Sequence, residues 1–422
     1  MHSRRYECRL CGSRDLIMRL PLKPIPVGEH YQATRSSEDA IRFPIDIYEC
    51  KRCSAVQTQD DIDPEFLWRD YTYFSGQTKG IQNHFSEFVS EFLELYANGK
   101  ANLDILDIGS NDGSLLQCFK DKGCRVQGID PAISVVTAAL SANIPTIHAL
   151  WGSDKAEQEL SEKTFDIITA FNVFAHSPDM NSMARSVVKH LKNDGLFCFE
   201  VQYLADISNK TILGTFFHEH MIHYSYASAS AFINKFGMEI IDAWRNNIQH
   251  GSIIFICSKV GAGKQISQGH GRVKDIMGHE ANEILNGSWS EKINNYILST
   301  QNHVNSFISK SSIGPKSLCG YGAARSGPTF AIQFGLDNYL YKLLDDHPSK
   351  VGRFSPYLSL PVYPVNTLNP DDDRFCVILA YIHYKKIISE NLEYLAGGGT
   401  FILLWPEFAL VTIENYARWV NS

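Results

Sequence analysis

The segment FFHEHMIHYS, residues 216–225, gathers three histidines and one glutamate: His218, Glu219, His220 and His223. Imidazole and carboxylate groups can bind metal ions or transfer protons near neutral pH. The zinc-protease motif H-E-x-x-H requires two histidines four residues apart on one helix face. Four residues after His218 stands Ile222, and His223 would lie about 140° around a helix from His218. The pattern therefore excludes a metal site of that type and leaves proton transfer as the candidate chemistry.

A second group of reactive residues consists of two matching segments, YECRLCGS at 6–13 and YECKRCSA at 48–55. Each contributes one C-x-x-C pair, and the four cysteines are Cys8, Cys11, Cys50 and Cys53. Two such turns complete the tetrahedral shell that Zn²⁺ prefers. Because four thiolates leave no ligand position for water, the pattern predicts a structural zinc site. The remaining cysteines are scattered singly, which is typical of core residues.

The bulk composition describes an ordinary globular protein. The chain has 422 residues, 44% of them hydrophobic and 20% charged, and a length of this order favours two or three domains. A formal charge of -7 without blocks of like charge argues against nucleic-acid binding. The first residues lack the apolar core of a signal peptide, and no apolar run approaches the roughly 18 residues of a membrane span. We expect a cytoplasmic protein with reduced cysteines and no membrane partner.

The elements that must position this chemistry follow a strand–turn–helix–strand rhythm. In LDILDIGSNDGSLLQCFKDKGCRVQGIDP an apolar strand leads into a glycine turn, an amphipathic helix and a second strand that ends at Asp130. This turn lacks the dinucleotide fingerprint G-x-G-x-x-G. A nucleoside ligand without a pyrophosphate fits better, and S-adenosylmethionine is the common one. The predicted cofactor-binding residues of this unit are Gly109, Asn111, Asp112, Gly113 and Asp130.

Two further strands are expected in FDIITAFNVFAHSPD (165–179) and GLFCFEVQYL (195–204). In an open α/β sheet, ligands bind beyond the carboxyl ends of the strands. Asn172 and Glu200 lie at such ends by this interpretation, and His176 follows Asn172 closely. We add Asn172 to the predicted cofactor site.

From about residue 300 the same rhythm begins again, with SLCGYGAARSGPTF, YLYKLLDDHPSKVGRFSP, VILAYIHY and GGTFILLWPE. A glycine turn that opens a helix, with an arginine in its first turns, suits a phosphate group. We predict substrate contacts from Tyr321, Arg325, Lys350 and Arg353.

Together these features resemble the sugar C-methyltransferase family, which methylates C3 of nucleotide-linked 4-keto-deoxysugars. The resemblance rests on the tandem C-x-x-C pairs, the LDIGSNDG turn, the NVFAHSPD run, the FHEH cluster and the GYGAARSG and DDHPSKVGR segments, and it spans nearly the whole chain. It implies an α/β fold in three domains: a zinc-binding domain at 1–70, a class I, Rossmann-like methyltransferase domain at 71–297, and a Rossmann-like nucleotide-sugar-binding domain at 298–422. It also implies S-adenosylmethionine and structural Zn²⁺ as cofactors.

The resemblance carries individual roles onto individual residues. The family's tyrosine in the D-Y-x-Y run falls on Tyr73, its histidine after the fourth strand on His176, and its Y-H-E-H motif on residues 217–220. Two positions depart from the family pattern: Phe217 stands where the family usually has tyrosine, and Tyr357 takes a glycine position.

Methylation of a carbon next to a ketone requires a base that removes a proton and a donor that stabilises the enolate oxygen. We predict His220 as the base, Glu219 as the group that orients or tunes it, and His176 or Tyr73 as the donor. The residues leave open which of Glu219 and His220 is the base itself. For His218 and His223 we expect a solvated loop.

Two alternatives stay open at this point. The same architecture could methylate an oxygen or nitrogen of a nucleotide sugar, since Phe217 cannot donate a hydrogen bond. The chain could also be a zinc-knuckle interaction protein without catalysis. We predict a monomer whose partner is a nucleotide-linked keto-deoxysugar, without nucleic acid.

Overall fold

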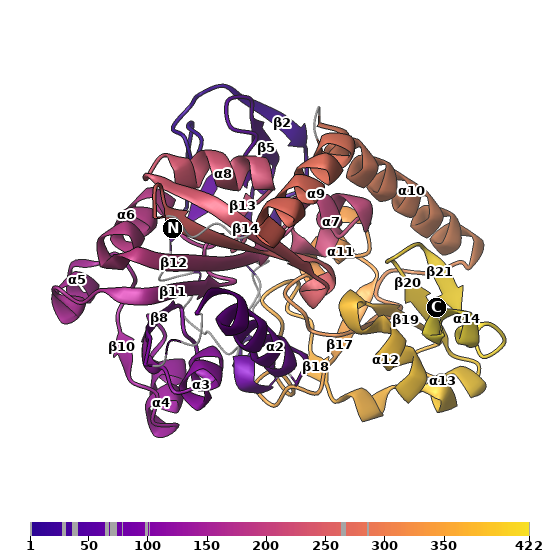
Figure 1. Ribbon diagram of the computed structural model, residues 1–422. Coiled ribbons are helices and arrows are strands. Elements are labelled where there is room, and N and C mark those ends of the chain that lie inside the picture. Colours follow the sequence, from indigo (N-terminus) through magenta and orange to yellow (C-terminus); the bar gives the residue numbers. More distant parts are fainter. Residues whose placement is uncertain are drawn as a thin grey trace.

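The computed structural model describes residues 2–27, 31–35, 41–63, 67, 74–77, 79–97, 100, 102–262, 267–284 and 287–421. It is an α/β structure, as predicted, with small amino-terminal sheets and two larger sheets that are covered by helices (Figure 1). In Figure 1 the central sheet lies on the left and the carboxy-terminal sheet on the right. Among the helices of the described ranges, none has both the length and the apolar character required to cross a bilayer.

The amino-terminal part is built from short strands. They are β1 (His2–Arg4), β2 (Leu16–Leu20), β3 (Ile25–Pro26), β4 (Arg42–Phe43), β5 (Ile47–Cys50), β6 (Val56–Thr58) and β7 (Asp60–Ile62). One four-stranded sheet, ordered β13-β6-β5-β2, takes its edge strand β13 (Ile222–His223) from the histidine-rich segment. In this antiparallel pair Ile222 faces Gln57 and His223 faces Val56. The zinc-knuckle region and the predicted catalytic segment therefore share one sheet.

The central sheet has seven strands in the order β10-β9-β8-β11-β12-β15-β14. Six strands run in the same direction, and β15 runs antiparallel between β12 and β14. The strands are β8 (Asp104–Ile108), β9 (Arg125–Asp130), β10 (Thr146–His148), β11 (Phe165–Phe171), β12 (Leu191–Gln202), β14 (Met238–Asn246) and β15 (Ser252–Lys259). From β8 the strand order runs outward to one edge of the sheet, and from β11 it runs outward to the other edge. The connections therefore leave β8 and β11 in opposite directions, which opens a ligand-binding crevice at their carboxyl ends.

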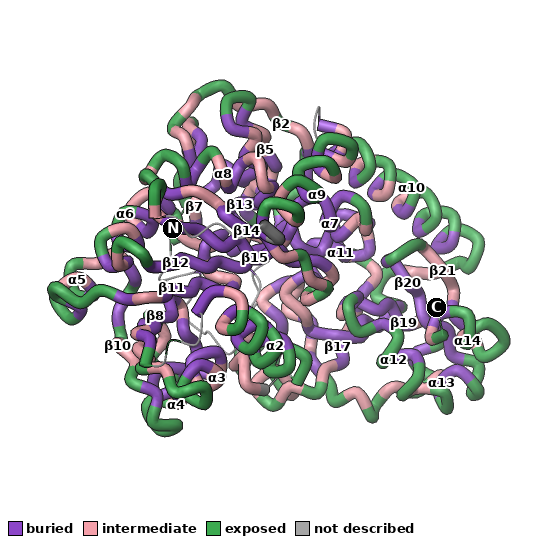
Figure 2. The backbone as a smooth tube through the Cα atoms, in the orientation of Figure 1, coloured by how far each residue is buried: buried purple, intermediate pink, exposed green. Residues whose placement is uncertain are grey.

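Both faces of this sheet are apolar because side chains alternate along each strand. Leu196 and Cys198 join the core under α2, while Phe197 and Phe199 join the larger core on the other face. Figure 2 shows the buried colour along β12 and β15 and the exposed colour along the outer turns of α10. The helices before the carboxy-terminal sheet are α2 (Lys79–Tyr96), α3 (Ser114–Asp121), α4 (Ile133–Ser141), α5 (Asp154–Leu160), α6 (Met180–His190), α7 (Leu204–Asn209), α8 (Tyr226–Asn234), α9 (Ser267–Glu283) and α10 (Ser288–Lys310).

The carboxy-terminal sheet has six strands in the order β18-β17-β16-β19-β20-β21, and only β21 is antiparallel. Its strands are β16 (Leu318–Tyr321), β17 (Leu340–Leu344), β18 (Val362–Tyr363), β19 (Phe375–Ile378), β20 (Thr400–Leu403) and β21 (Ala409–Val411). Its helices are α11 (Gly327–Gln333), α12 (Tyr384–Glu390), α13 (Leu392–Ala396) and α14 (Tyr416–Val420). This is a doubly wound order with its crevice between β16 and β19. The predicted domain limits of 1–70, 71–297 and 298–422 stay predictions.

Short 3₁₀ helices join these elements. They are η1 (Ser75–Gln77), η2 (Leu213–Thr215), η3 (Ile248–His250), η5 (Val365–Thr367) and η6 (Tyr381–His383). Of these, η2 directly precedes the histidine-rich segment.

Candidate active site

The four predicted zinc ligands come together in the structure. The sulfur atoms of Cys8, Cys11, Cys50 and Cys53 all lie within 4.8 Å of one another. The Cys8–Cys53 and Cys11–Cys50 Sγ distances are both 3.6 Å, close to the edge of about 3.8 Å expected for a tetrahedron with Zn–S bonds of about 2.3 Å. Both distances exceed the roughly 2.05 Å of a disulfide. The site fits a structural Zn²⁺.

The two knuckles repeat the same turn. The Cys8 N–H donates to the Ser13 carbonyl at 2.8 Å, and the Cys50 N–H donates to the Ala55 carbonyl at 2.9 Å. The residue after each second cysteine, Gly12 or Ser54, has a positive φ of 73° or 56°. Gln57 donates to Cys8 Sγ at 3.2 Å, which stabilises the thiolate form that a metal requires.

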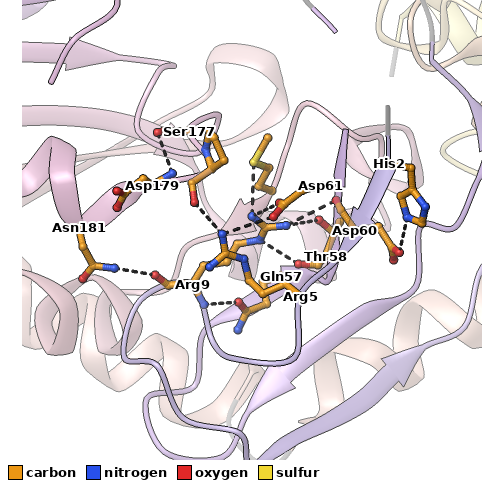
Figure 3. Close-up of polar contacts among 12 residues, drawn as sticks. His2, Arg5, Arg9, Gln57, Thr58, Asp60, Asp61, Ser177, Asp179 and Asn181 are labelled. Atoms are coloured by element: carbon orange, nitrogen blue, oxygen red, sulfur yellow. Dashed lines mark hydrogen bonds and ion pairs between the residues drawn. The ribbon is translucent and has the colours of Figure 1, made fainter. Parts of the chain in front are cut away.

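Arg9, inside the first knuckle, connects the zinc site to the rest of the molecule (Figure 3). Its buried guanidinium forms an ion pair with Asp61 at 2.6 Å and donates to the Thr58 carbonyl at 2.9 Å. The same group lies 3.6 Å from Met221 Sδ, and the Arg9 carbonyl accepts a hydrogen bond from Asn181 of α6 at 3.1 Å. The knuckle therefore holds both the central domain and the histidine-rich segment.

The predicted cofactor turn lies between β8 and α3 at the carboxyl edge of the central sheet. Gly109, Asn111 and Gly113 adopt positive φ values of 66°, 51° and 81°, which aim backbone groups across the turn. A Cβ on Gly109 would lie 2.4 Å from a Val173 methyl group, so this position requires glycine. Asn111 and Asp112 accept hydrogen bonds from the backbone N–H groups of Ser75 and Gly76 at 3.0 and 2.8 Å.

Asp130 closes β9 beside this turn. Its two carboxylate oxygens accept from the backbone N–H groups of Asn111 at 3.0 Å and Ala132 at 2.8 Å, and burial raises its pKa. The neighbouring Ser110 Oγ is buried and makes no hydrogen bond within the described part of the chain. A turn with a buried hydroxyl left for a polar partner and an acid beside it fits an adenosyl ligand.

The end of β11 leads directly from the cofactor turn to the histidines. Asn172, with φ 57°, follows the last residue of the strand, and four residues later His176 remains partly exposed. Glu200, at the carboxyl end of β12, is fully buried and binds His84 at 2.9 Å and Asn246 at 2.7 Å. Glu200 therefore connects α2 to the sheet.

Three parts of the molecule hold the histidine-rich segment. In the zinc-knuckle region, β6 pairs with β13. In the central domain, the Ala175 carbonyl accepts a hydrogen bond from the Met221 N–H at 3.0 Å. The carboxy-terminal domain contributes Thr329, whose hydroxyl donates to the Phe216 carbonyl at 3.1 Å. A Cβ on Gly214 would lie 2.4 Å from the Tyr381 ring, so the segment also packs tightly against that domain.

His220 is held in one tautomer. Its Nδ1 lies 2.8 Å from the Thr215 carbonyl oxygen, which can only accept, so Nδ1 carries the proton and Nε2 is the free base. The rings of Phe217 and His176 lie 4.0 and 5.0 Å from it, between centroids. Burial, opposed by the Thr215 bond, lowers the pKa of His220 to about 4, so the ring is neutral at pH 7.

The carboxylate of Glu219 forms an ion pair with Arg325 of the carboxy-terminal domain, and Nδ1 of His220 faces Thr215. The predicted role of Glu219, to orient or tune His220, stays a prediction. The arginine charge also lowers the pKa of His176 and His220, so it lies near both rings. Burial is the larger cause of both shifts.

The expected solvated loop around His218 and His223 is wrong. Both side chains are buried, and burial lowers their pKa values to about 4 and about 3. His218 Nε2 lies 3.1 Å from the Pro44 carbonyl, and the His223 ring packs on Phe216 at 4.7 Å. Pairing with β6 buried the segment, and the local sequence does not reveal that pairing.

The predicted substrate residues divide between two places. Lys350 donates to the Ala323 carbonyl at 2.8 Å and lies over the Tyr31 ring, and Arg353 donates to the Tyr31 carbonyl at 3.4 Å. Arg325 precedes α11 rather than lying in its first turns, and it faces Glu219. Tyr321 packs within the sheet, where its hydroxyl accepts from Asn391 at 3.4 Å.

A small pocket opens at the crevice of the carboxy-terminal sheet. Its walls come from the loop after β16, from residues 355–357, and from Tyr31 of the amino-terminal part. The Tyr31 hydroxyl donates to the Ala323 carbonyl at 2.8 Å. Sequence reasoning missed Tyr31, because no motif marks a residue that reaches the pocket from another domain.

Other site residues were also missed. Thr215 and Gln202 form a hydrogen-bonded pair beside His220, and no spacing rule connects them. Asp107, in the strand before the cofactor turn, is buried, and this burial raises its pKa to about 7. Its place in LDIG could have drawn attention to it. Tyr73 lies outside the described residues.

Comparisons with known proteins agree with this architecture. A zinc binding domain model matches residues 8–68, a methyltransferase domain model matches 81–242, and a C-methyltransferase C-terminal domain model matches 247–406. The C-methyltransferase NovU of Streptomyces niveus is 24% identical over 413 residues, which is 97% of either chain. The chain is an S-adenosylmethionine-dependent C-methyltransferase.

Two further proteins match a smaller share of this C-methyltransferase. A ubiquinone biosynthesis O-methyltransferase of Hydrogenovibrio crunogenus is 30% identical over 118 residues, 27% of this chain and 46% of that protein. A solved S-adenosylmethionine-dependent methyltransferase from Clostridium acetobutylicum is 15% identical, with a TM-score of 0.35 over 47% of this chain and 96% of that one. The full-length match and the matched C-methyltransferase domain exclude the non-catalytic alternative.

Proposed function

We propose that this C-methyltransferase methylates C3 of a nucleotide-linked 4-keto-deoxysugar, with His220 as the general base. The observation that carries the proposal is the hydrogen bond from His220 Nδ1 to the Thr215 carbonyl, which leaves Nε2 unprotonated. A neutral imidazole with a fixed free nitrogen is suited to remove a proton from a carbon next to a ketone.

The enolate oxygen that forms needs a donor or a nearby positive charge. His176 lies 5.0 Å from His220 between ring centroids, and Arg325 places a guanidinium near both rings. We assign the stabilising role to His176, with Arg325 held in place by Glu219. Tyr73, the other predicted donor, stays a prediction because it lies outside the described residues.

S-adenosylmethionine, when bound, supplies the electrophilic methyl group. The residues proposed to hold it are those of the turn from Gly109 to Gly113, with Asp130 and Asn172. Phe217 covers one face of the base and helps to keep water from it, because its ring lies 4.0 Å from that of His220. An apolar ring here favours the neutral base that carbon deprotonation requires.

For the nucleotide part we propose the crevice between β16 and β19. Lys350 and Arg353 approach its rim, and Tyr31 offers an aromatic face. Tyr321 is proposed to support the floor of this crevice through the sheet. Methylation at oxygen or nitrogen is less well supported, since the O-methyltransferase of Hydrogenovibrio crunogenus matches about a quarter of the chain, whereas a C-methyltransferase C-terminal domain model matches residues 247–406.

The substitution His220→Ala tests the proposed base. We expect methyl transfer to a nucleotide 4-keto-deoxysugar to fall by about 100-fold or more, because general base catalysis is worth roughly that much. Calorimetric titration should show unchanged S-adenosylmethionine binding. His303→Ala, at an exposed position, is the matched control. Turnover by His220→Ala near the wild-type rate would remove His220 from the mechanism.

A further inference from the structure

Two polar side chains lie behind the proposed base, on the side away from Nε2. Thr215 lies at the end of η2, and its Oγ1 lies 3.1 Å from His220 Nδ1. Its carbonyl oxygen lies 2.8 Å from the same nitrogen. Nδ1 therefore faces both oxygens of a single residue.

The direction of the Thr215 hydroxyl decides whether this arrangement favours one tautomer. A hydroxyl that donates to Nδ1 would place the histidine proton on Nε2 and abolish the base. In the structure the Thr215 hydroxyl instead donates to Gln202 Oε1. A lone pair of the Thr215 hydroxyl oxygen is then left to accept from the Nδ1–H of His220. The hydroxyl and the carbonyl of Thr215 therefore favour the same tautomer.

Gln202 is fixed in turn. It is the last residue of β12, where it pairs with Ser252 of β15. Its Nε2 donates to Gln249 Oε1 at 3.4 Å, so its amide oxygen is the atom that faces Thr215. The hydrogen-bond directions run from Gln202 through Thr215 to His220 without conflict.

We infer that Gln202 and Thr215 are positioning residues that hold His220 with its proton on Nδ1 and its free nitrogen toward the substrate. The inference rests on the proposed role of His220 as the base. When Nε2 gains a proton, the Nδ1–H bonds to Thr215 become charge-assisted and strengthen, so they also favour the proton transfer. Within the described part of the chain, Arg325, His176 and His223 are further charged or titratable groups near the ring, and both contacts shown for Nδ1 are with Thr215.

A double-mutant cycle tests this order of dependence. Thr215→Val removes one of two acceptors but keeps the carbonyl, so kcat should fall severalfold and the tautomer should persist. Gln202→Leu frees the hydroxyl to donate to Nδ1, so kcat should fall about tenfold. The double variant should behave like Thr215→Val alone, because Gln202 acts only through that hydroxyl. Thr215→Ser keeps the hydroxyl and should therefore behave like the wild type. Thr367→Val, at an exposed position, is the control.

The tautomer itself is read from long-range ¹H–¹⁵N spectra of full-length protein with labelled histidine, in which His220→Asn identifies the signal. We expect wild-type His220 to carry its proton on Nδ1 and Gln202→Leu to show an Nε2–H population. A wild-type Nε2–H ring, or losses in kcat that are simply additive, would overturn the inference. Failure of the proposed function would show separately, as turnover by His220→Ala, and the wild-type spectrum would still decide the tautomer.

Discussion

At the scale of single residues, the site is a group of histidines that the fold keeps neutral. Burial lowers the pKa values of His176, His218, His220 and His223. The sequence predicted proton-transfer chemistry for this segment. It did not show which histidines are buried, because burial comes from β6, α11 and the end of β11, which are distant in the chain.

The buried histidines predict acid instability. The unfolded chain binds protons near pH 6.5, whereas folded His223 does so near about 3, so stability is lost as the pH falls from about 6.5 toward that value. Replacing His223 with leucine should reduce the slope of the unfolding free energy against pH, between about pH 6 and 4, by about 1.4 kcal/mol per pH unit. Denaturant unfolding at several pH values measures this slope. An unchanged slope would contradict the assignment of His223 as a buried neutral group.

At the scale of elements, the zinc knuckle and β13 form one structural unit. The tandem C-x-x-C spacing was sufficient to predict the metal site, because the ligand pattern is local within each knuckle. It could not predict that Arg9, between two ligands, would reach Met221. That contact depends on strand pairing between segments more than 160 residues apart in sequence, as the Ile222–Gln57 register shows.

The buried position of Arg9 predicts a large cost for its removal. Arg9→Met removes the 2.6 Å ion pair with Asp61, which keeps only the 3.3 Å pair with Arg5, and should lower the unfolding free energy by about 3 kcal/mol. Bound zinc, measured by elemental analysis, should be retained, since all four cysteines remain. Arg14→Met is the matched control, because Arg14 is 81% exposed and its pair with Glu7 lies on the surface. Equal effects of the two substitutions would show that Arg9 has no such role.

At the scale of the whole molecule, the proposed active site lies where the amino-terminal, central and carboxy-terminal parts of the chain meet. The α/β character of both large sheets could be anticipated from the strand–turn–helix rhythm, and the glycine turn from Gly109 to Gly113 lies between β8 and α3. The sequence could not predict that Glu219 pairs with Arg325 or that Tyr31 lines the carboxy-terminal pocket. Contacts between domains leave no periodic signal in a single sequence, since each side is a lone polar residue.

The central claim is that His220 acts as the base and that the methyl group is transferred to carbon. The most direct measurement is to incubate the protein with methyl-¹³C S-adenosylmethionine and a nucleotide-linked 4-keto-deoxysugar and to record the carbon spectrum of the product. We expect a labelled methyl group bonded to C3, with loss of the proton at that carbon. A labelled methyl group bonded to oxygen or nitrogen would contradict it.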